Sequence, residues 1–171
     1  RLGADAPAGK TRWTAEEALD LADALFVGVE IAGSPLATIN VLGPTVVASD
    51  FGNNWGLILG QSIDGWRERA FDSLTCKTSI DGGLVGTGSA GDLPGGPAEA
   101  FAWLLSHCAA RGRPLKAGDL VTTGAVTGVH DIVADQTARV DFGTFGEILC
   151  RAKPAGPIGE EETVNEQRDR S

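Results

Sequence analysis

The chain has 171 residues, a length that suits one domain, and 42% of them are hydrophobic. This content is sufficient for a buried core without covalent staples, and it excludes a chain that is disordered throughout. The 14 basic and 23 acidic residues give a net charge of −9. This charge disfavours nucleic acid as a partner, because it would repel the phosphates.

The cysteines and the hydropathy of the chain indicate in which cellular compartment the protein is expected. Cys76, Cys108 and Cys150 lie far apart and form no Cys-x-x-Cys or Cys/His cluster, so we expect reduced thiols rather than disulfides or a zinc site. No apolar run approaches the roughly 18 residues of a membrane-spanning helix, and the amino end lacks a signal pattern. We therefore expect a cytoplasmic protein with no membrane partner.

The first regular elements are a helix and a strand. A helix is predicted over residues 15–25, since Thr14 and Glu17 have the spacing of a capping box, in which each side chain satisfies a backbone amide. Residues 26–31 then alternate with the two-residue period of a strand. This strand carries one carboxylate, Glu30.

The middle of the chain has short elements and polar loops. Two apolar runs, residues 45–48 and 57–59, flank residues 50–56, whose glycine and asparagine content predicts a loop typical of a site. A β-hairpin with a primed Asp-Gly-Gly turn is predicted over residues 74–85. Residues 86–96, mostly Gly, Ser, Asp and Pro, are expected to form a mobile loop.

A second helix and further strands follow. Pro97 suits the first helical turn, and Gly112 supplies the left-handed residue that ends the helix. Strand-like runs then occupy residues 120–123, 138–142 and 147–151. Two main helices among many short strands predict an α+β fold that is dominated by β-structure and has a mixed sheet.

The boundaries follow from this pattern. Residues 1–13 lead into a domain that we expect to span residues 14–152. Residues 153–171 contain three consecutive glutamates and almost no large apolar side chain, so a flexible tail is expected there. Because the first residue is arginine, we expect the chain to begin after processing or inside a longer polypeptide.

The two histidines are candidates for proton transfer. His107 lies beside the apolar stripe of the second helix, where a solvent-exposed role is expected. His130 lies in a loop next to Asp131, and a histidine near a carboxylate can carry a proton; a purely structural histidine is the alternative. The chain has no Gly-x-Ser-x-Gly, P-loop or Rossmann motif, so the standard nucleophile and nucleotide sites are excluded.

Glu30 is a candidate metal ligand. It shares a strand face with Gly28 and precedes the loop rich in amides; the alternative is a carboxylate at a sheet edge in water. A hard divalent cation collects about six oxygen ligands, so one carboxylate cannot hold it alone. Any metal at Glu30 would therefore be shared with groups from elsewhere.

Four segments carry a family resemblance. They are Thr14–Ile31 (TAEEALDLADALFVGVEI), Val47–Gly60 (VASDFGNNWGLILG), Gly95–Ala100 (GGPAEA) with Trp103-Leu104, and Pro114–Ala125 (PLKAGDLVTTGA). In this order they resemble the carboxyl-terminal part of the 2-keto-4-pentenoate hydratase and 4-oxalocrotonate decarboxylase group, within the fumarylacetoacetate hydrolase superfamily. The resemblance implies the fold of that superfamily, of β-roll type, over most of residues 14–152.

The resemblance also implies a site. In such enzymes three acidic side chains hold Mg²⁺ or Mn²⁺: a Glu-x-Glu pair on one strand and a third acid on a later strand, which Glu30 matches. Asn53 and Asn54 match a Ser- or Asn-rich segment that faces the substrate. Thr127 matches a position that lines the same pocket.

The chain departs from the family pattern at three places. No Glu-x-Glu precedes Glu30, since Glu16 and Glu17 are contiguous at a helix start. The lysine-bearing segment of the family is missing, and residues 131–136 replace a Pro…Gly-Asp turn. We therefore expect the other metal ligands to lie outside these residues, and the general acid or base to come from elsewhere or from His130.

The resemblance implies a metal-dependent lyase, a hydratase or decarboxylase, that acts on small 2-oxo or 2-hydroxydienoic acids in the catabolism of aromatic compounds. In the family the metal acts as a Lewis acid on the dienolate oxygen. Two alternatives stay open: an acylpyruvate-type hydrolase of C–C bonds in the same superfamily, and a non-catalytic relative with a structural or assembly role.

The resemblance further implies a homo-oligomer, because relatives commonly form one. The four tryptophans bear on this expectation, since they either cover β-edges at an interface or belong to an ordinary core. They are Trp13, Trp55, Trp66 and Trp103.

Overall fold

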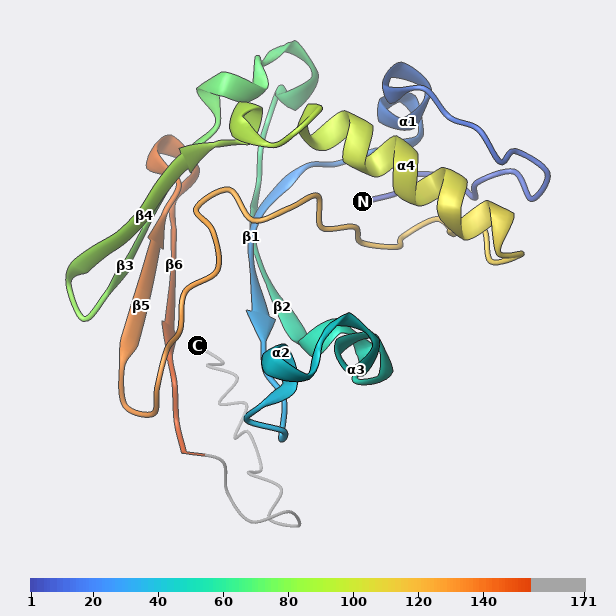
Figure 1. Cartoon of the computed structure of the whole chain (residues 1–171). Helices are drawn as coiled ribbons and strands as arrows, with labels where there is room; N and C mark the ends of the chain where they lie inside the picture. The colour runs from blue at the N-terminus through green and yellow to red at the C-terminus, as the bar shows by residue number, and fades with distance from the viewer. Residues whose placement is uncertain (155–171) are drawn as a thin grey trace, which may run out of the picture.

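Two antiparallel sheets form the body of the protein, as the computed structural model of the chain shows over residues 1–154 (Figure 1). The smaller sheet pairs β1 (Phe26–Ala32) with β2 (Asn54–Ser62). The larger has the order β4-β3-β5-β6 and consists of β3 (Thr75–Ile80), β4 (Gly83–Ser89), β5 (Thr137–Asp141) and β6 (Glu147–Arg151). These strands confirm the predicted hairpin and the strands at 26–31, 138–142 and 147–151. The prediction of a mixed sheet is wrong for the described residues, whose strand pairings are all antiparallel.

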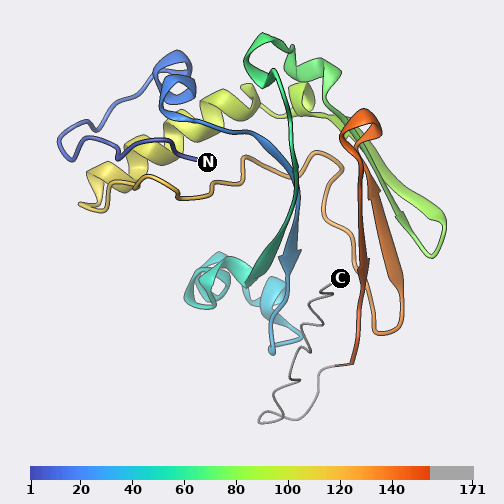
Figure 2. The same ribbon diagram turned by 180° about the vertical axis from the view of Figure 1, so that it is seen from behind.

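Two helices pack against each other at one end of the sheets, α1 (Ala15–Leu21) and α4 (Gly96–Ala110) (Figures 1 and 2). The capping box is present, because Thr14 Oγ1 accepts from the Glu17 amide at 3.2 Å and Glu17 Oε2 accepts from the Thr14 amide at 2.9 Å. Helix α1 ends at Leu21 rather than at the predicted residue 25. The reason is that Ala22 adopts an extended conformation and forms a β-bridge with Leu2.

The hydrophobic core lies mainly between these helices and the start of β1. Leu105 of α4 and Ala18 of α1 are completely buried, and Leu2 is 1% exposed. Burying a leucine side chain contributes about 1.5–3 kcal/mol, so these contacts hold α4 against the rest of the domain. Trp66 belongs to this core and Trp13 packs against it, whereas Trp55 and Trp103 are exposed. The core interpretation of the tryptophans therefore holds for two of the four.

Two short helices that the sequence analysis did not predict lie between β1 and β2: α2 (Ile39–Leu42) and α3 (Pro44–Ser49). The apolar run at residues 45–48 lies inside α3, with Pro44 at its first turn. The predicted loop at residues 50–56 is wrong at its end, where the last three residues form the start of β2. Pairing of Asn54 with Ala32 of β1 draws them into the sheet.

Two further expectations are overturned. Residues 86–89 belong to β4 instead of a loop, because they pair with β3. Residues 120–123 have no regular secondary structure instead of forming a strand, because they lie in the segment that runs from α4 towards the larger sheet (Figure 1). Short apolar runs and glycine content do not reveal such tertiary pairing.

The segment that follows residue 120 makes a close approach to β4, and glycines permit it. A Cβ atom at Gly86 would lie 2.5 Å from the Thr127 carbonyl oxygen and 2.6 Å from His130 Nε2. A Cβ atom at Gly88 would overlap the Val126 carbonyl oxygen. Any side chain at these positions would therefore push residues 126–130 off the sheet.

Three remaining expectations concern the thiols, the membrane and the tail. The three cysteines are free, as predicted. Among residues 1–154, no helix has the length and apolar character needed to cross a bilayer. The predicted tail lies outside the described residues from residue 155 onwards.

Replacing Gly88 by alanine tests the close approach. Because the added methyl group meets a backbone oxygen, which cannot rotate away, we expect Gly88→Ala to lower the free energy of unfolding by roughly 1–3 kcal/mol. Gly9→Ala is the matched control, since its Cβ meets nothing within 4 Å, and its effect should stay within about 0.5 kcal/mol. Chemical unfolding of both variants measures the difference, and equal stabilities would contradict the packing described.

Candidate functional site

A large open cavity of about 1210 Å³ lies between the two sheets. One wall is the β1–β2 pair, and the opposite wall is the inner face of β3, β5 and β6. Residues 120–132 of the irregular segment complete the lining. Its walls are largely aliphatic, with Val29, Leu57, Ile80 and Val140 among them. Such a space is typical of a small-molecule site that is apolar with a few convergent polar groups.

All five residues that the sequence analysis selected lie at this one cavity: Glu30, Asn53, Asn54, Thr127 and His130. They come from three separate parts of the chain. Glu30 lies on β1, the two asparagines lie where the 3₁₀ turn Phe51–Asn53 meets β2, and the last two lie on the irregular segment. The fold therefore brings together residues up to about a hundred positions apart.

Glu30 offers an uncommitted carboxylate. It is exposed, lies opposite Leu57 of β2, and forms none of the ion pairs found among residues 1–154. In that same part of the chain, no three His, Cys, Asp or Glu side chains lie close enough together to hold a metal ion. The described residues thus supply one oxygen ligand and do not form a complete metal site.

The two asparagines differ in their surroundings. Asn53 Nδ2 donates to Asn40 Oδ1 at 3.1 Å, and the Asn53 carbonyl accepts from the Gly33 amide at 2.8 Å, so Asn53 links the turn to α2 and β1. Its own Oδ1 is buried without a hydrogen-bond partner, which a donor from water or a ligand would satisfy. Asn54 is exposed at the cavity, where its amide can meet a ligand directly.

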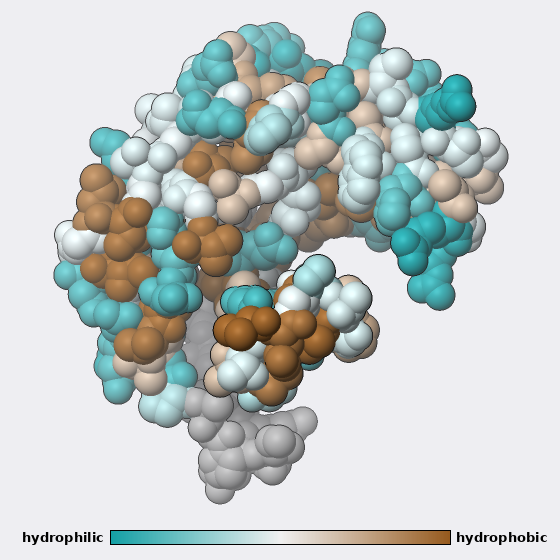
Figure 3. All heavy atoms as spheres, viewed as in Figure 1, coloured by the Kyte–Doolittle hydropathy of each residue, from teal (hydrophilic) through white to brown (hydrophobic). Residues whose placement is uncertain are grey.

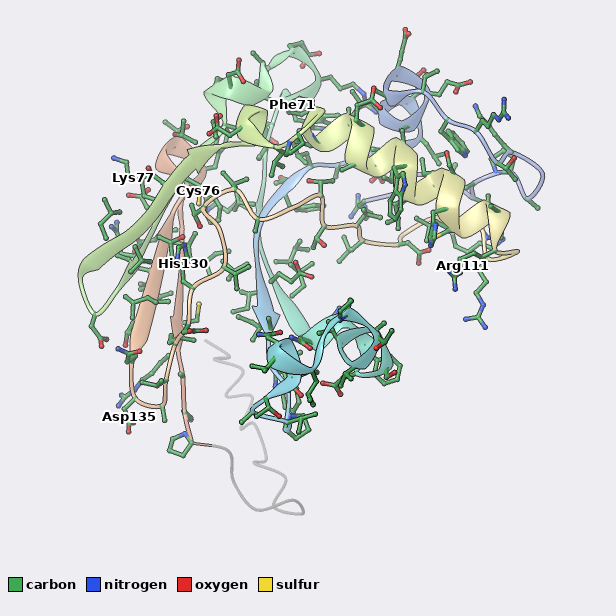
Figure 4. All side chains as sticks on the ribbon, viewed as in Figure 1. Phe71, Cys76, Lys77, Arg111, His130 and Asp135 are labelled. Carbon is green, nitrogen blue, oxygen red and sulfur yellow. The ribbon has the colours of Figure 1, made fainter. Side chains whose placement is uncertain are left out.

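Thr127 is held at two of its atoms. Its Oγ1 lies 2.9 Å from Thr78 Oγ1, and its carbonyl oxygen lies 2.8 Å from His130 Nε2. Because a carbonyl only accepts, Nε2 carries the proton in this contact, which leaves Nδ1 as the basic nitrogen of a neutral ring. Figure 4 shows His130 beside the strands of the larger sheet, with Cys76 on β3.

The sequence analysis did not select Thr78. It lies on β3, is only 8% exposed, and points to the same face as Cys76 and Ile80, all of which line the cavity. The signal was present in the alternation of residues 74–80, where one hydroxyl interrupts an otherwise apolar face. A polar side chain on such a buried strand face requires a hydrogen-bond partner, which Thr127 provides.

Burial raises the pKa of the Cys76 thiol, with a smaller effect in the opposite direction from its hydrogen bond with Thr78. The charge of Asp141 raises that pKa further. The thiol therefore stays neutral at physiological pH.

His107 lies outside the cavity. It is exposed on α4, as expected, and stacks on Trp103 with ring centroids 4.8 Å apart.

Comparison with known sequences identifies the family. The sequence pattern described as Fumarylacetoacetate (FAA) hydrolase C-terminal matches residues 13–159, which is most of the chain. The chain belongs to this family. Among its relatives are 2-keto-4-pentenoate hydratase from Paraburkholderia xenovorans (strain LB400) and 2-keto-4-pentenoate hydratase 3 from Pseudomonas putida, each 30% identical over 113 residues. Each match covers 66% of this chain and 42% of the relative.

The fold of the family is also that of two solved structures of 4-oxalocrotonate decarboxylase from Pseudomonas putida G7. The complex with magnesium and adipate has a TM-score of 0.76 at 21% identity, covering 88% of this chain and 57% of the other. The complex with calcium and acetate has a TM-score of 0.71 at 20% identity, covering 89% and 55%. The chain thus spans less than half the length of the hydratases and somewhat over half that of the decarboxylase.

Proposed function

We propose that this chain is part of a metal-dependent lyase, a hydratase or decarboxylase, that acts on small 2-oxo or 2-hydroxydienoic acids in the catabolism of aromatic compounds. The observation that carries the proposal is that Glu30, Asn53, Asn54, Thr127 and His130 all line one cavity. The names of the relatives support the reaction class, since they are hydratases and a decarboxylase.

The cavity residues suit such a substrate. The Asn54 amide and the Thr127 hydroxyl can donate to a carboxylate or a 2-oxo oxygen, and the aliphatic walls suit an unsaturated carbon chain. His130, whose Nδ1 can accept a proton, is the candidate general base or acid. Hydrogen bonds made inside a cavity with apolar walls are stronger than the same bonds in water.

The proposed cofactor is Mg²⁺ or Mn²⁺, with Glu30 as one ligand. The decarboxylase structures contain magnesium or calcium, which supports a divalent cation with oxygen ligands. The described residues do not complete its coordination. We therefore propose that groups outside residues 1–154, or from a second polypeptide, provide the remaining ligands.

Metal titration tests the role of Glu30. Because removing the charged oxygen ligand weakens the bond to a hard cation, we expect Glu30→Gln to weaken Mn²⁺ binding about tenfold or more, measured by titration calorimetry or electron paramagnetic resonance. Glu16→Gln is the control, since Glu16 is an exposed glutamate on α1 outside the cavity. Equal Mn²⁺ affinities in the two variants would remove Glu30 from the metal site.

Product analysis separates the reaction classes. We expect the chain, once Mg²⁺ is bound and its remaining ligands are supplied, to hydrate 2-hydroxypenta-2,4-dienoate or to decarboxylate 2-oxohex-3-enedioate, and nuclear magnetic resonance identifies the products. Cleavage of acetylpyruvate to pyruvate and acetate instead would favour the hydrolase alternative. If the metal is bound with all its ligands and no substrate of either type is converted, the result favours the non-catalytic alternative.

We also propose that the chain forms a homo-oligomer through the α2–α3 surface, meaning Leu36, Val41, Leu42, Phe51 and Trp55. These apolar side chains are 42–87% exposed and lie within or next to α2 and α3 in the chain. Figure 3 shows a hydrophobic surface over these two helices. Residues 31–49 contain no charged side chain. In a protein with a net charge of −9, such a neutral apolar surface is where two copies can meet without like-charge repulsion.

A charge placed on that surface tests the oligomer. We expect Val41→Asp to shift the chain towards the monomer in light scattering coupled to gel filtration, because each interface would bury two new carboxylates. Trp103→Asp, on the exposed face of α4 and away from the α2–α3 surface, should leave the mass unchanged. A monomeric unaltered chain, or loss of the oligomer in Trp103→Asp alone, would contradict this interface.

A further inference from the structure

Thr78 is buried at the cavity, and its hydroxyl lies 2.9 Å from the hydroxyl of Thr127. Each hydroxyl has a single proton, so only one of the two can donate across this contact. If Thr78 donates, the proton of Thr127 is free for a third group. If Thr127 donates, it can offer a ligand only its acceptor lone pairs.

The burial of Thr78 favours the first arrangement. Thr78 is 8% exposed, and among residues 1–154 the Thr127 hydroxyl is the one oxygen within hydrogen-bond distance of its side chain. If Thr127 were the donor, the proton of Thr78 would be left with the sulfur of Cys76, which is a weak acceptor. Thr127 is only partly buried at the cavity, so its own proton can reach a ligand when Thr78 donates.

The backbone of Thr127 is fixed as well. His130 holds its carbonyl oxygen at 2.8 Å, and the bare Cα of Gly86 lets both residues lie against β4. With the main chain held, rotation about the side chain is the remaining freedom of Thr127. The hydrogen bond from Thr78 removes that freedom.

We infer that Thr78 is a positioning residue, which directs the hydroxyl proton of Thr127 into the cavity towards a carboxylate group of the bound molecule. The inference rests on the proposed function, in which Thr127 binds the substrate. It predicts that Thr78 contributes to ligand affinity only through Thr127.

Adipate is the probe, because it is bound in the decarboxylase structure. With Mg²⁺ present, we expect Thr78→Val to weaken adipate binding roughly three- to tenfold in titration calorimetry, which is the effect of one lost hydrogen bond. Thr78→Ser keeps the hydroxyl and should bind within about twofold of the unaltered chain. Thr87→Val, an exposed threonine on β4 outside the cavity, is the matched control and should bind normally.

The double variant Thr78→Val/Thr127→Val decides between positioning and a merely structural role. If Thr78 acts through Thr127, the double variant binds adipate no more weakly than Thr127→Val alone, whereas independent roles give effects that multiply. Thr78→Ala removes the same hydroxyl with a smaller side chain, so the test survives if Thr78→Val fails to fold. It should weaken binding by a similar factor.

The outcomes distinguish the inference from the function on which it rests. If Thr127→Val weakens binding while Thr78→Val and Thr78→Ala do not, or if the effects multiply, the positioning role is wrong and the proposed function stands. If Thr127→Val binds adipate normally, or the unaltered chain does not bind it, the assigned role of Thr127 in the proposed function is wrong, and the inference fails with it.

Discussion

The close approach between the irregular segment and β4 is the contact on which the cavity depends. Gly86 and Gly88 present bare Cα atoms to residues 126–130, and no other residue type leaves that space. Through this contact the segment lies on the larger sheet, where Thr127 meets Thr78. The β1–β2 pair lies on the opposite side with Glu30. The polar groups of the cavity converge because two side chains are missing from β4.

The charges at the cavity constrain which molecules it can hold. Arg1 and Arg151 lie at its lining, but each is engaged in an ion pair, with Asp23 at 2.9 Å and Asp135 at 3.4 Å. Glu30 adds a negative charge without a counter-ion among residues 1–154, in a protein whose net charge is −9. An anionic substrate therefore finds no free cationic side chain of Lys or Arg in the described lining, which is consistent with the proposal that a cation shared with other groups offsets the charge.

The sequence predicted those elements whose signals are local. The capping box of Thr14 and Glu17, the primed turn after β3 and the helix between Pro97 and Gly112 depend on neighbouring residues, so their patterns could be recognised. Residues 86–89 were misassigned because their glycines serve a contact with residues 126–130, forty positions away. For the site, the resemblance selected Glu30, Asn53, Asn54 and Thr127, and the neighbouring Asp131 pointed to His130; all five line the cavity. Neither line of reasoning found Thr78, whose partner becomes visible only once the segment is folded over the sheet.

The turn before β2 shows how the fold retains an unfavourable local conformation beside the cavity. Phe51 and Asn53 both have positive φ, at 53° and 61°, which is uncommon for residues other than glycine and costs of the order of 1–3 kcal/mol for a bulky side chain. Phe51 is 87% exposed, so burial of its ring does not offset this cost. The hydrogen bonds of Asn53 to Asn40 and Gly33, together with pairing of Asn54 with Ala32, hold the turn in place. Because these same contacts set where Asn54 enters the cavity, the conformational strain and the placement of this amide have a common origin.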